Sequence, residues 1–513
     1  MQLDRTACFD IDMQTVLAQF DIHIPNIQVK RVVMDSRQAT QDTAFLCLEA
    51  VPERRAQYMQ NAVTNGATLI IQDSPRAELH GYCDFVHARP VVSFMNLKHR
   101  LGEFCNACYD APTTKLCNIA ITGTNGKTSV THIIAQLASL SGYDIGTLGT
   151  LGINYYPSQT QGDLIAESIN TSVDVLSFHH YCAWFLRQGA KIVASEASSH
   201  GLAQNRLQGA LVDIAVFTNL SQDHLDYHGD MASYAMAKRQ LLKVDGVKQL
   251  VLNYDDPESK AWFEAKTQAQ EVIYFSIDPK TQINDLNQRY CIAKDIQRHN
   301  NGINFSLCSS WGNHQVRLAL VGDFNLANFV CAMATLLAAG YTFEQLIAHC
   351  DKISGVPGRM EMHHDQGGKA LVVDYAHTPD ALEKALIAAR QHCSGKLWVV
   401  FGCGGDRDKD KRHKMGRIAE SLADQLVLTQ DNSRSENAEK IIADIMQGIG
   451  GTSGLHIELD RKQAITYAYT QMADNDLVLI AGKGHEQYME VQDTLEFYDE
   501  RLFVRNLLAE QTI

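Results

Sequence analysis

The sequence lacks several features that mark particular classes of protein. Among its 513 residues, which carry a net charge of -14, there is no lysine- or arginine-rich block, so the footprint of a nucleic-acid-binding protein is missing. The longest apolar run, near Phe329–Ala339, is too short to cross a bilayer. The first residues are acidic where a secretory signal is basic, and no apolar core follows them. We therefore expect a cytoplasmic protein that engages neither nucleic acid nor membrane.

The cysteines show no pattern that predicts disulfides or a zinc site. The chain has 13 of them, an odd number scattered along its length. Cys105 and Cys108 lie three residues apart, but no second pair follows at metal-ligand spacing. Buried thiols of a cytosolic protein are the simpler interpretation. No internal repeat or low-complexity tract is present either.

What is present is the pattern of an α/β protein. Hydrophobic residues make up 45% and charged residues 20%, as in soluble globular proteins, and the length predicts about three domains. From Lys115 onward, apolar strand-like runs alternate with amphipathic helices, which is typical of a mostly parallel, helix-covered sheet. Strands are predicted at 45–48, 68–71, 116–121, 191–194, 214–217, 249–252, 370–373, 397–401, 426–428 and 477–480. A polar stretch at 278–320 predicts strands and turns. We predict a small N-terminal α/β domain at 1–100, a central parallel-sheet domain at 101–355 and a C-terminal α/β domain at 356–513.

The strongest local motif is Gly123-Thr124-Asn125-Gly126-Lys127-Thr128. It follows a predicted strand and precedes a helix predicted at 129–139, which is the context of a phosphate-binding loop. In such a loop glycines turn backbone N–H groups toward phosphate oxygens, Lys127 reaches the β- and γ-phosphates and Thr128 can bind Mg²⁺. The strict motif has a glycine where this chain has Ile121, so the loop is a shorter variant. The alternative is a surface turn with a chance lysine, which the flanking strand and helix disfavour.

Further polar side chains follow the ends of predicted strands, where open α/β sheets bind ligands. Glu196 could hold Mg²⁺ beside the phosphates or simply cap a helix. The segment 218–229, TNLSQDHLDYHG, holds two histidines and two aspartates within six residues, and its alternative is a polar loop. Lys238 would, on its own, be interpreted as a solvated surface lysine.

The last third of the chain repeats this arrangement. Segments 374–379, 402–408 and 482–486 each follow a predicted strand, and Thr378 is a good helix N-cap. Arg407 and Arg434 also follow strands and could reach the same edge of the sheet, where paired guanidiniums bind a carboxylate. Surface ion pairing is the alternative for each arginine taken singly.

Taken together, these motifs resemble the Mur ligase family, which builds the peptide stem of peptidoglycan. GTNGKT, Glu196, NLSQDHLDYHG, the segment 322–328, GVPGRME and DYAHTPDALEKAL occur in the family's order and spacing over nearly the whole chain. SSHGL, GCGGDRDKDKR and GKGHE are most similar to members that add meso-diaminopimelate. The resemblance implies an α/β protein of three domains: 1–100 binds the UDP-linked substrate, 101–355 is a P-loop domain that binds ATP, and 356–513 is Rossmann-like and binds the amino acid. It implies a monomer that joins meso-diaminopimelate to a UDP-N-acetylmuramoyl-dipeptide through an acyl phosphate, with ATP and Mg²⁺.

The resemblance also assigns residues. Lys127, Lys238 and His224 would be catalytic, with Lys238 carbamylated, and the metal ligands would be Thr128, Glu196, His224 and Lys238. The ATP-binding residues would be Gly123, Thr124, Asn125, Gly126, Lys127, Thr128, Ser129, Asn325, Arg359 and Asp374. The residues that bind the UDP-linked substrate would be Ser36, Asn170, Thr171, Ser172, Ser198, Gln204 and Arg206. The residues that bind the amino acid would be Arg407, Asp431, Asn432, Ser433, Arg434, Gly482 and Glu486.

The chain departs from the family pattern at two places. The amino-acid selector, Asp-Asn-Pro-Arg in the family, has Ser433 in place of the proline that stiffens the loop, whereas Arg434 is kept. The segment 51–57, VPERRAQ, stands where relatives have a glycine- and aspartate-containing loop near the uridine. The alternatives are a related ligase for another amino acid such as L-lysine, a folate polyglutamate synthetase, and a nucleotide-binding homologue without catalysis. SSHGL and the two arginines disfavour the folate enzyme, and Lys127, Glu196, His224 and Lys238 disfavour the inactive homologue.

Overall fold

The computed structural model describes residues 8–168, 170–281, 288–299, 301–365, 367–451, 453–492 and 494–510, without the side chains of Asp226 and Glu510. The chain forms two compact units. The first comprises residues 1–273 and 335–340, and the second comprises residues 274–334 and 341–513. Each is described by itself below. In the described part of the chain no helix is both long and apolar enough to span a membrane.

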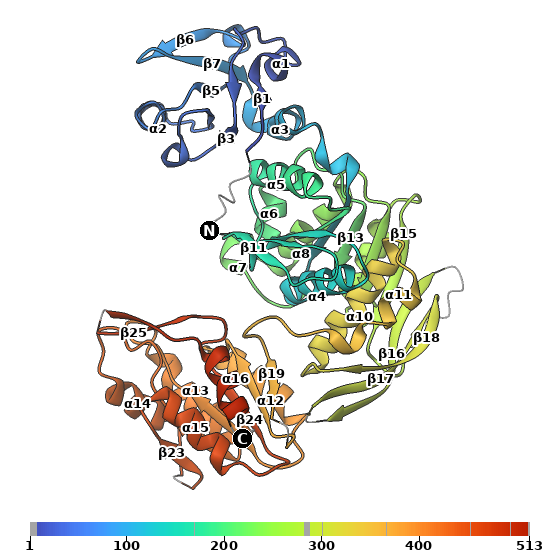
Figure 1. Cartoon of the computed structure of the whole chain (residues 1–513), viewed down its shortest axis with the longest axis vertical. Helices are drawn as coiled ribbons and strands as arrows, with labels where there is room; N and C mark the ends of the chain where they lie inside the picture. Colours follow the sequence, from blue (N-terminus) through green and yellow to red (C-terminus); the bar gives the residue numbers. More distant parts are fainter. Residues whose placement is uncertain are drawn as a thin grey trace. The chain divides into compact units, whose positions relative to one another are not determined.

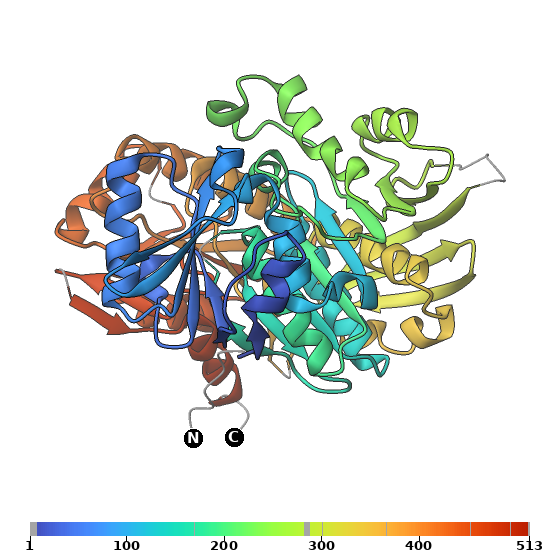
Figure 2. The ribbon, with the colours of Figure 1, turned by 90° about the horizontal axis from the view of Figure 1, so that it is seen from above.

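The first unit begins with a five-stranded sheet in the order β3-β4-β5-β7-β6, parallel except for β6. Alternate residues of its strands pack on opposite faces. Phe45 and Ile70 pack with α2, whereas Leu46 and Ile71 pack with α1 and α3 (Figures 1 and 2). The strands are β3 (Arg31–Val33), β4 (Thr43–Cys47), β5 (Leu69–Ser74), β6 (Cys83–Val86) and β7 (Arg89–Met95), the helices are α1 (Met13–Ala18), α2 (Pro52–Thr64) and α3 (Leu101–Tyr109), and β1 (Ile11–Asp12) pairs with β2 (Gln28–Val29).

The segment 51–57 is not a loop, although the family pattern led us to expect one. Pro52 occupies the first turn of α2, where its missing N–H leaves no hydrogen bond unmade, and Glu53 suits the positive helix end. The helix therefore begins at Pro52 and includes residues 52–57.

The same unit contains a second, mostly parallel set of strands in the order β11-β10-β9-β12-β8-β13-β14. β9, β12, β8, β13 and β14 run parallel, whereas β10 and β11 are antiparallel additions at the edge. The strands are β8 (Cys117–Thr122), β9 (Ile145–Gly149), β10 (Gly152–Tyr156), β11 (Asp163–Ala166), β12 (Ile192–Glu196), β13 (Ile214–Phe217) and β14 (Gln249–Asn253). The helices are α4 (Lys127–Leu140), α5 (Val175–Arg187), α6 (Ser199–Ala203), α7 (Leu225–His228), α8 (Met231–Arg239) and α9 (Glu258–Ala265).

The polar stretch 278–320 does contain strands and turns, as predicted. β15 (Glu271–Ser276) spans the point where the chain passes from the first unit to the second, and β16 (Arg289–His299), β17 (Gly302–Ser309) and β18 (Gly312–Leu318) form an antiparallel meander. Residues 282–287 and 300 of this stretch lie outside the described residues. Two helices follow, α10 (Asp323–Ala338) and α11 (Phe343–Ile347).

The rest of the second unit is a six-stranded sheet in the order β19-β20-β24-β21-β22-β23, parallel except for β19. Leu397 and Val399 face α12–α14, whereas Trp398 and Val400 face α15 and α16, so both faces are covered. The strands are β19 (Glu361–His364), β20 (Ala370–Asp374), β21 (Leu397–Phe401), β22 (Gln425–Leu428), β23 (Leu455–Ile457) and β24 (Leu477–Ala481), followed by the hairpin β25 (Tyr488–Val491) and β26 (Thr494–Phe497). The helices are α12 (Pro379–Arg390), α13 (Asp410–Leu422), α14 (Ala438–Met446), α15 (Arg461–Gln471) and α16 (Glu500–Glu510). Thr378 caps α12 by accepting from the Ala381 N–H.

Candidate functional site

The predicted phosphate loop connects the end of β8 to the start of α4. Gly123 and Gly126 both have positive φ, at +145° and +87°, which glycine adopts without strain. A Cβ on Gly123 would lie 1.9 Å from Thr218 Oγ1, so only glycine fits there. The loop is held from β13 as well, because Thr218 Oγ1 donates to the Asn125 carbonyl at 2.6 Å. The surface-turn interpretation is therefore wrong: this is a strand–loop–helix with its backbone fixed on both sides.

Two lysines converge on the carbonyl of Gly123. Lys127 donates to it at 2.9 Å and also to the Thr124 carbonyl, and Lys238 donates to it at 2.8 Å. Lys238 is only 1% exposed, so it is not a solvated surface lysine. Burial, with the nearby charge of Lys127, lowers the pKa of Lys238 to about 6, and burial also lowers the pKa of Lys127. Both lysine side chains are therefore held against the backbone of the phosphate loop.

Glu196 is the last residue of β12 and is 4% exposed. Its carboxylate accepts from Thr128 Oγ1 at 3.0 Å, from the Thr150 N–H at 2.8 Å and from Thr150 Oγ1 at 3.2 Å. Burial raises the pKa of Glu196. Its oxygens and that of Thr128 are the hard ligands that Mg²⁺ prefers, so these residues fit the ion. The helix-capping alternative is wrong, because Ser198 caps the following helix α6.

His224 offers less support for a metal role. It lies in a loop with φ of 52°, and its half-exposed ring is 3.5 Å from Asp223 and 4.8 Å, between centroids, from His200. The described residues contain no group of three or more His, Cys, Asp or Glu side chains that could bind a metal. A Mg²⁺ ion here would therefore depend on Glu196, Thr128 and the phosphates of the nucleotide.

Most of the predicted residues for the UDP-linked substrate lie together. Ser172 Oγ donates to the Glu196 carbonyl at 2.8 Å and accepts from the Ser198 N–H at 2.8 Å. Arg206 donates to the Ser172 carbonyl, and its Nη2 donates to Gln204 at 2.8 Å. Thr171 Oγ1 accepts from Thr150 at 3.4 Å, and Asn170 is exposed beside it. Ser36 is not among these contacts. It lies shortly after β3 in the chain and is buried, and its carbonyl accepts a hydrogen bond from the Asn65 side chain.

In the second unit, the predicted nucleotide residues Asn325, Arg359 and Asp374 have well-defined surroundings. Asn325 is buried and donates to the Val321 carbonyl at 2.9 Å. Asp374 ends β20 and accepts from the N–H groups of Met360 and Ala376 at 2.7 and 2.8 Å, and its burial raises its pKa. The Arg359 guanidinium stacks 4.6 Å from the centroid of the Tyr375 ring.

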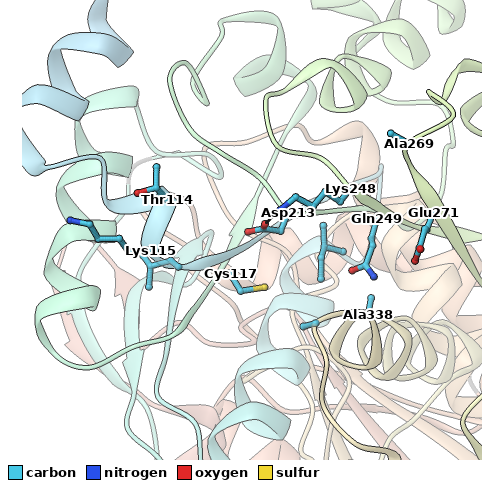
Figure 3. A pocket seen from close by; sticks show the side chains of 12 residues that line it. Thr114, Lys115, Cys117, Asp213, Lys248, Gln249, Ala269, Glu271 and Ala338 are labelled. Carbon is cyan, nitrogen blue, oxygen red and sulfur yellow. Dashed lines mark hydrogen bonds and ion pairs between the residues drawn. The ribbon is translucent and has the colours of Figure 1, made fainter.

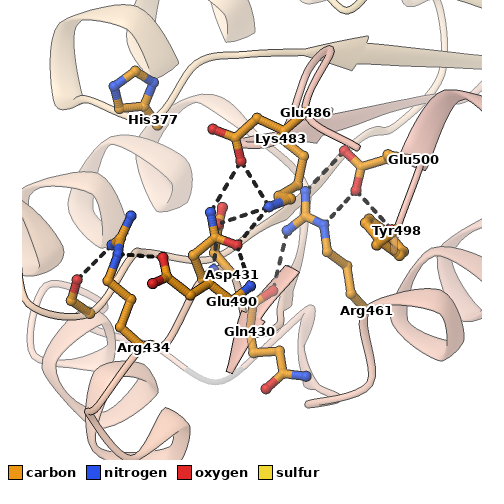
Figure 4. Close-up of polar contacts among 12 residues, drawn as sticks. His377, Gln430, Asp431, Arg434, Arg461, Lys483, Glu486, Glu490, Tyr498 and Glu500 are labelled. Atoms are coloured by element: carbon orange, nitrogen blue, oxygen red, sulfur yellow. Dashed lines mark hydrogen bonds and ion pairs between the residues drawn. The ribbon is translucent and has the colours of Figure 1, made fainter. Parts of the chain in front are cut away.

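The predicted amino-acid residues meet where β22 and β24 end (Figure 4). Lys483, fully buried, donates to Asn432 Oδ1 at 2.8 Å and to Glu486 at 2.9 Å, and Asn432 donates to Glu486 at 3.1 Å. A Cβ on Gly482 would lie 2.6 Å from Asp431, so glycine is required there. Arg407 is exposed, so it is not part of this hydrogen-bonded group.

Ser433 is buried at the centre of the selector, and Arg434 beside it has φ of 49°. The stiffness that the missing proline would supply comes instead from the hairpin. Arg434 N–H donates to the Glu490 carbonyl at 3.0 Å, and the Gln492 N–H donates to the Arg434 carbonyl at 2.8 Å. These two hydrogen bonds hold the backbone of Arg434 from outside the selector motif.

Three residues of these sites were missed from the sequence. Thr150 directly follows the short strand β9, in a turn with no motif of its own. Lys483 lies within GKGHE, a motif that by itself predicts no role for the lysine. Glu490 lies in a hairpin that contacts the selector only in the folded structure. Of the three, only Lys483 had a usable signal, a lysine between two glycines directly after a buried strand.

A shallow pocket of about 710 Å³ lies at the other end of the parallel strands (Figure 3). It is lined by Cys117, Ile214 and Gln249, the residues where β8, β13 and β14 begin. The phosphate loop follows the carboxyl end of β8, so this pocket is not part of the nucleotide site.

A phosphate loop on a parallel sheet, with a buried carboxylate beside it, defines a nucleotide-binding α/β enzyme. Residues 121–336 match the Mur ligase middle domain, and residues 358–484 match the Mur ligase, glutamate ligase domain. The UDP-N-acetylmuramoyl-L-alanyl-D-glutamate–2,6-diaminopimelate ligase of Haemophilus influenzae strain Rd is 36% identical over 93% of this chain and 96% of its own. That of strain PittGG is 37% identical over the same shares. A solved structure of a ligase of this name superposes with a TM-score of 0.73 at 33% identity, covering 98% of this chain and all of the other.

The chain belongs to the Mur ligase family and has its three-domain fold. It is an ATP-dependent ligase that forms carbon–nitrogen bonds between an acid and an amino acid. The boundaries predicted at residues 100 and 355 stay predictions.

Proposed function

We propose that this chain adds meso-2,6-diaminopimelate to UDP-N-acetylmuramoyl-L-alanyl-D-glutamate, with ATP and Mg²⁺, in peptidoglycan synthesis. The observation that carries the proposal is the 36% identity to a 2,6-diaminopimelate ligase over 93% of the chain. The retained Arg434, whose side chain is held by Glu490 and the Gly405 carbonyl, fits an amino acid with a distal carboxylate. We further propose that the enzyme acts as a monomer in the cytoplasm, where nucleotide-linked substrates and ATP are available.

The proposed reaction has two steps. The γ-carboxylate of the substrate's D-glutamate attacks the γ-phosphorus of ATP. The bond to the bridging oxygen breaks, ADP departs, and an acyl phosphate remains. The uncharged amine of diaminopimelate then attacks the acyl carbon, phosphate leaves, and the amine proton passes to solvent or a nearby base. One amide bond forms for each ATP cleaved.

In this reaction the loop binds and orients the phosphates. The N–H groups of residues 123–129 and the start of α4 would hold the phosphate oxygens, and Lys127 would exchange its carbonyl partners for the γ-phosphate. When bound beside Glu196 and Thr128, Mg²⁺ would offset the charge that builds on the transferring oxygens. Ser172, Ser198 and Arg206 would position the acceptor carboxylate.

We also propose that Lys238 is carbamylated, as the family resemblance implies. In its uncharged amine form, the Lys238 Nζ would attack CO₂, form a nitrogen–carbon bond and release one proton. The resulting carbamate is an anion that can bind a second Mg²⁺. The support is its burial against the loop, 2.8 Å from the Gly123 carbonyl.

Phosphate release from ATP tests the proposed function. Purified protein is incubated with ATP, Mg²⁺ and UDP-N-acetylmuramoyl-L-alanyl-D-glutamate, with meso-diaminopimelate, with L-lysine or without an amino acid. We expect release with diaminopimelate alone, together with a product whose mass equals the sum of the two substrates less one water. Lys127→Ala is the inactive control. Release with L-lysine alone would replace the proposed amino acid, and no release in any mixture would favour an inactive homologue.

A further inference from the structure

Arg434 is held in an ion pair by a residue outside the selector. Its Nε donates to Glu490 Oε2 at 2.9 Å, and its Nη1 donates to the Gly405 carbonyl at 2.7 Å (Figure 4). Glu490 belongs to β25, and its backbone is bound to the selector through its N–H, which donates to Asn432 Oδ1 at 2.9 Å, and through its carbonyl, which accepts from Arg434. The carboxylate is therefore fixed beside the arginine by main-chain contacts that do not involve the carboxylate itself.

This ion pair leaves one donor and one acceptor unused. Among the described residues, Arg434 Nη2 and Glu490 Oε1 have no hydrogen-bond partner. The two side chains are 19% and 30% exposed, so both ends are accessible without movement of the backbone. A ligand that uses both ends must carry a carboxylate and an ammonium close together.

The distal end of meso-diaminopimelate has that chemistry, because one carbon carries both a carboxylate and an ammonium. L-Lysine offers the ammonium alone, and 2-aminopimelate offers the carboxylate alone. We propose that Glu490 is a specificity-determining residue: its carboxylate accepts from the distal ammonium while Arg434 donates to the distal carboxylate. This inference rests on the proposed function and adds a contact that the selector motif does not contain.

The competing interpretation is that Glu490 only orients Arg434. The two roles differ in which ligand group they affect, since orientation serves the distal carboxylate, whereas direct contact serves the distal ammonium. Glu490→Gln separates them. The amide oxygen can still accept from Arg434 Nε, and the backbone contacts of residue 490 are unchanged. What is lost is the negative charge that faces the ammonium.

The experiment measures KM and kcat for meso-diaminopimelate and for 2-aminopimelate with the wild type and with Glu490→Gln. A charge-assisted hydrogen bond in a half-exposed position corresponds to about a tenfold change in affinity. We expect KM for diaminopimelate to rise about tenfold in the variant and KM for 2-aminopimelate to change less than about threefold, with kcat near the wild-type value for both. The wild-type preference for diaminopimelate over 2-aminopimelate should therefore largely disappear.

Glu496→Gln is the matched control. Glu496 lies on the same hairpin and is exposed, and the substitution removes the same charge. It should leave every constant unchanged. An equal rise of KM for both amino acids in Glu490→Gln would show an orienting role only, and unchanged constants would show no role. Either result overturns the inference. If the wild-type protein does not use diaminopimelate, the proposed function fails first, and that result is seen before any variant is made.

Discussion

The ion pair between Arg461 and Glu500 yields the sharpest prediction for stability. Arg461 begins α15 and Glu500 begins α16, and their side chains are 1% and 0% exposed. Arg461 Nη2 donates to Glu500 Oε1 at 3.1 Å and to the Ala481 carbonyl at 2.9 Å, and the Tyr498 hydroxyl donates to Glu500 at 3.0 Å (Figure 4). Glu500→Gln keeps the volume but leaves a buried guanidinium without its counter-charge.

The size of the effect follows from this burial. Removal of one partner of a buried ion pair costs about 3–5 kcal/mol, because the remaining charge keeps its desolvation penalty and loses its compensation. Removal of both charges in Arg461→Met with Glu500→Leu should cost less than about 2 kcal/mol, since no buried charge remains. Arg461 also donates hydrogen bonds to the carbonyls of Gln430 and Ala481, the residues directly before Asp431 and Gly482. We therefore expect Glu500→Gln to raise KM for the amino acid as well.

The assay must report on the second unit alone, because a chain with two compact units need not unfold in a single transition. Hydrogen exchange of the β24 amides, measured by mass spectrometry on the full chain, gives a local free energy of opening. Lys384→Gln is the control, since it breaks an ion pair with Asp380 whose partners are 67% and 74% exposed, and it should cost less than about 0.5 kcal/mol. A loss below about 1 kcal/mol in Glu500→Gln, or a double variant as unstable as the sum of the single variants, would refute the reasoning.

Three further predictions concern the loop, the lysine and the acid limit of stability. Gly123→Ala, whose Cβ would lie 1.9 Å from a threonine oxygen, should weaken ATP binding at least about tenfold by calorimetry, whereas Gly142→Ala, with positive φ but nothing within 4 Å, should not. Wild-type protein incubated with ¹³C-bicarbonate should show one labelled carbamate by NMR that Lys238→Met lacks, and a signal retained in the variant would place the carbamate elsewhere. Hydrogen bonds from Arg412 lower the pKa of Glu436 from 4.5 to about 2, so its contribution to stability is present above pH 4.5 and is lost as the pH falls toward 2. Glu436→Gln should therefore flatten the fall of the opening free energy of the second unit, measured by hydrogen exchange over that pH range, and an unchanged fall would contradict this assignment.

The sequence predicted the parallel strands well, because their signal is local. Buried strands of a parallel sheet are continuous apolar runs, and 214–217 and 397–401 match β13 and β21 residue for residue. The phosphate loop after β8 was predicted equally well, because the glycines and the following helix are both indicated by neighbouring residues of the sequence. The start of α2 was missed for the opposite reason. Comparison with relatives indicated a loop at 51–57, whereas Pro52 and Glu53 themselves favour the first turn of a helix.

The same distinction applies to the site residues: those in local motifs could be predicted from the sequence, whereas those placed by tertiary contacts could not. Lys238 has no neighbours in sequence that indicate burial, and only its packing against the loop between β8 and α4 removes it from solvent. Glu490 is a still stronger case: it lies 56 residues from Arg434, in a hairpin with exposed Leu495 and Phe497, and nothing near it predicts a contact with the selector. Because Glu490 lies outside the selector motif, a comparison of Ser433 with proline does not reveal the contacts that hold Arg434. The contacts that hold Arg434 therefore have to be sought among its backbone partners in three dimensions. Here those partners place the Glu490 carboxylate, which lies outside the selector motif, beside the Arg434 guanidinium.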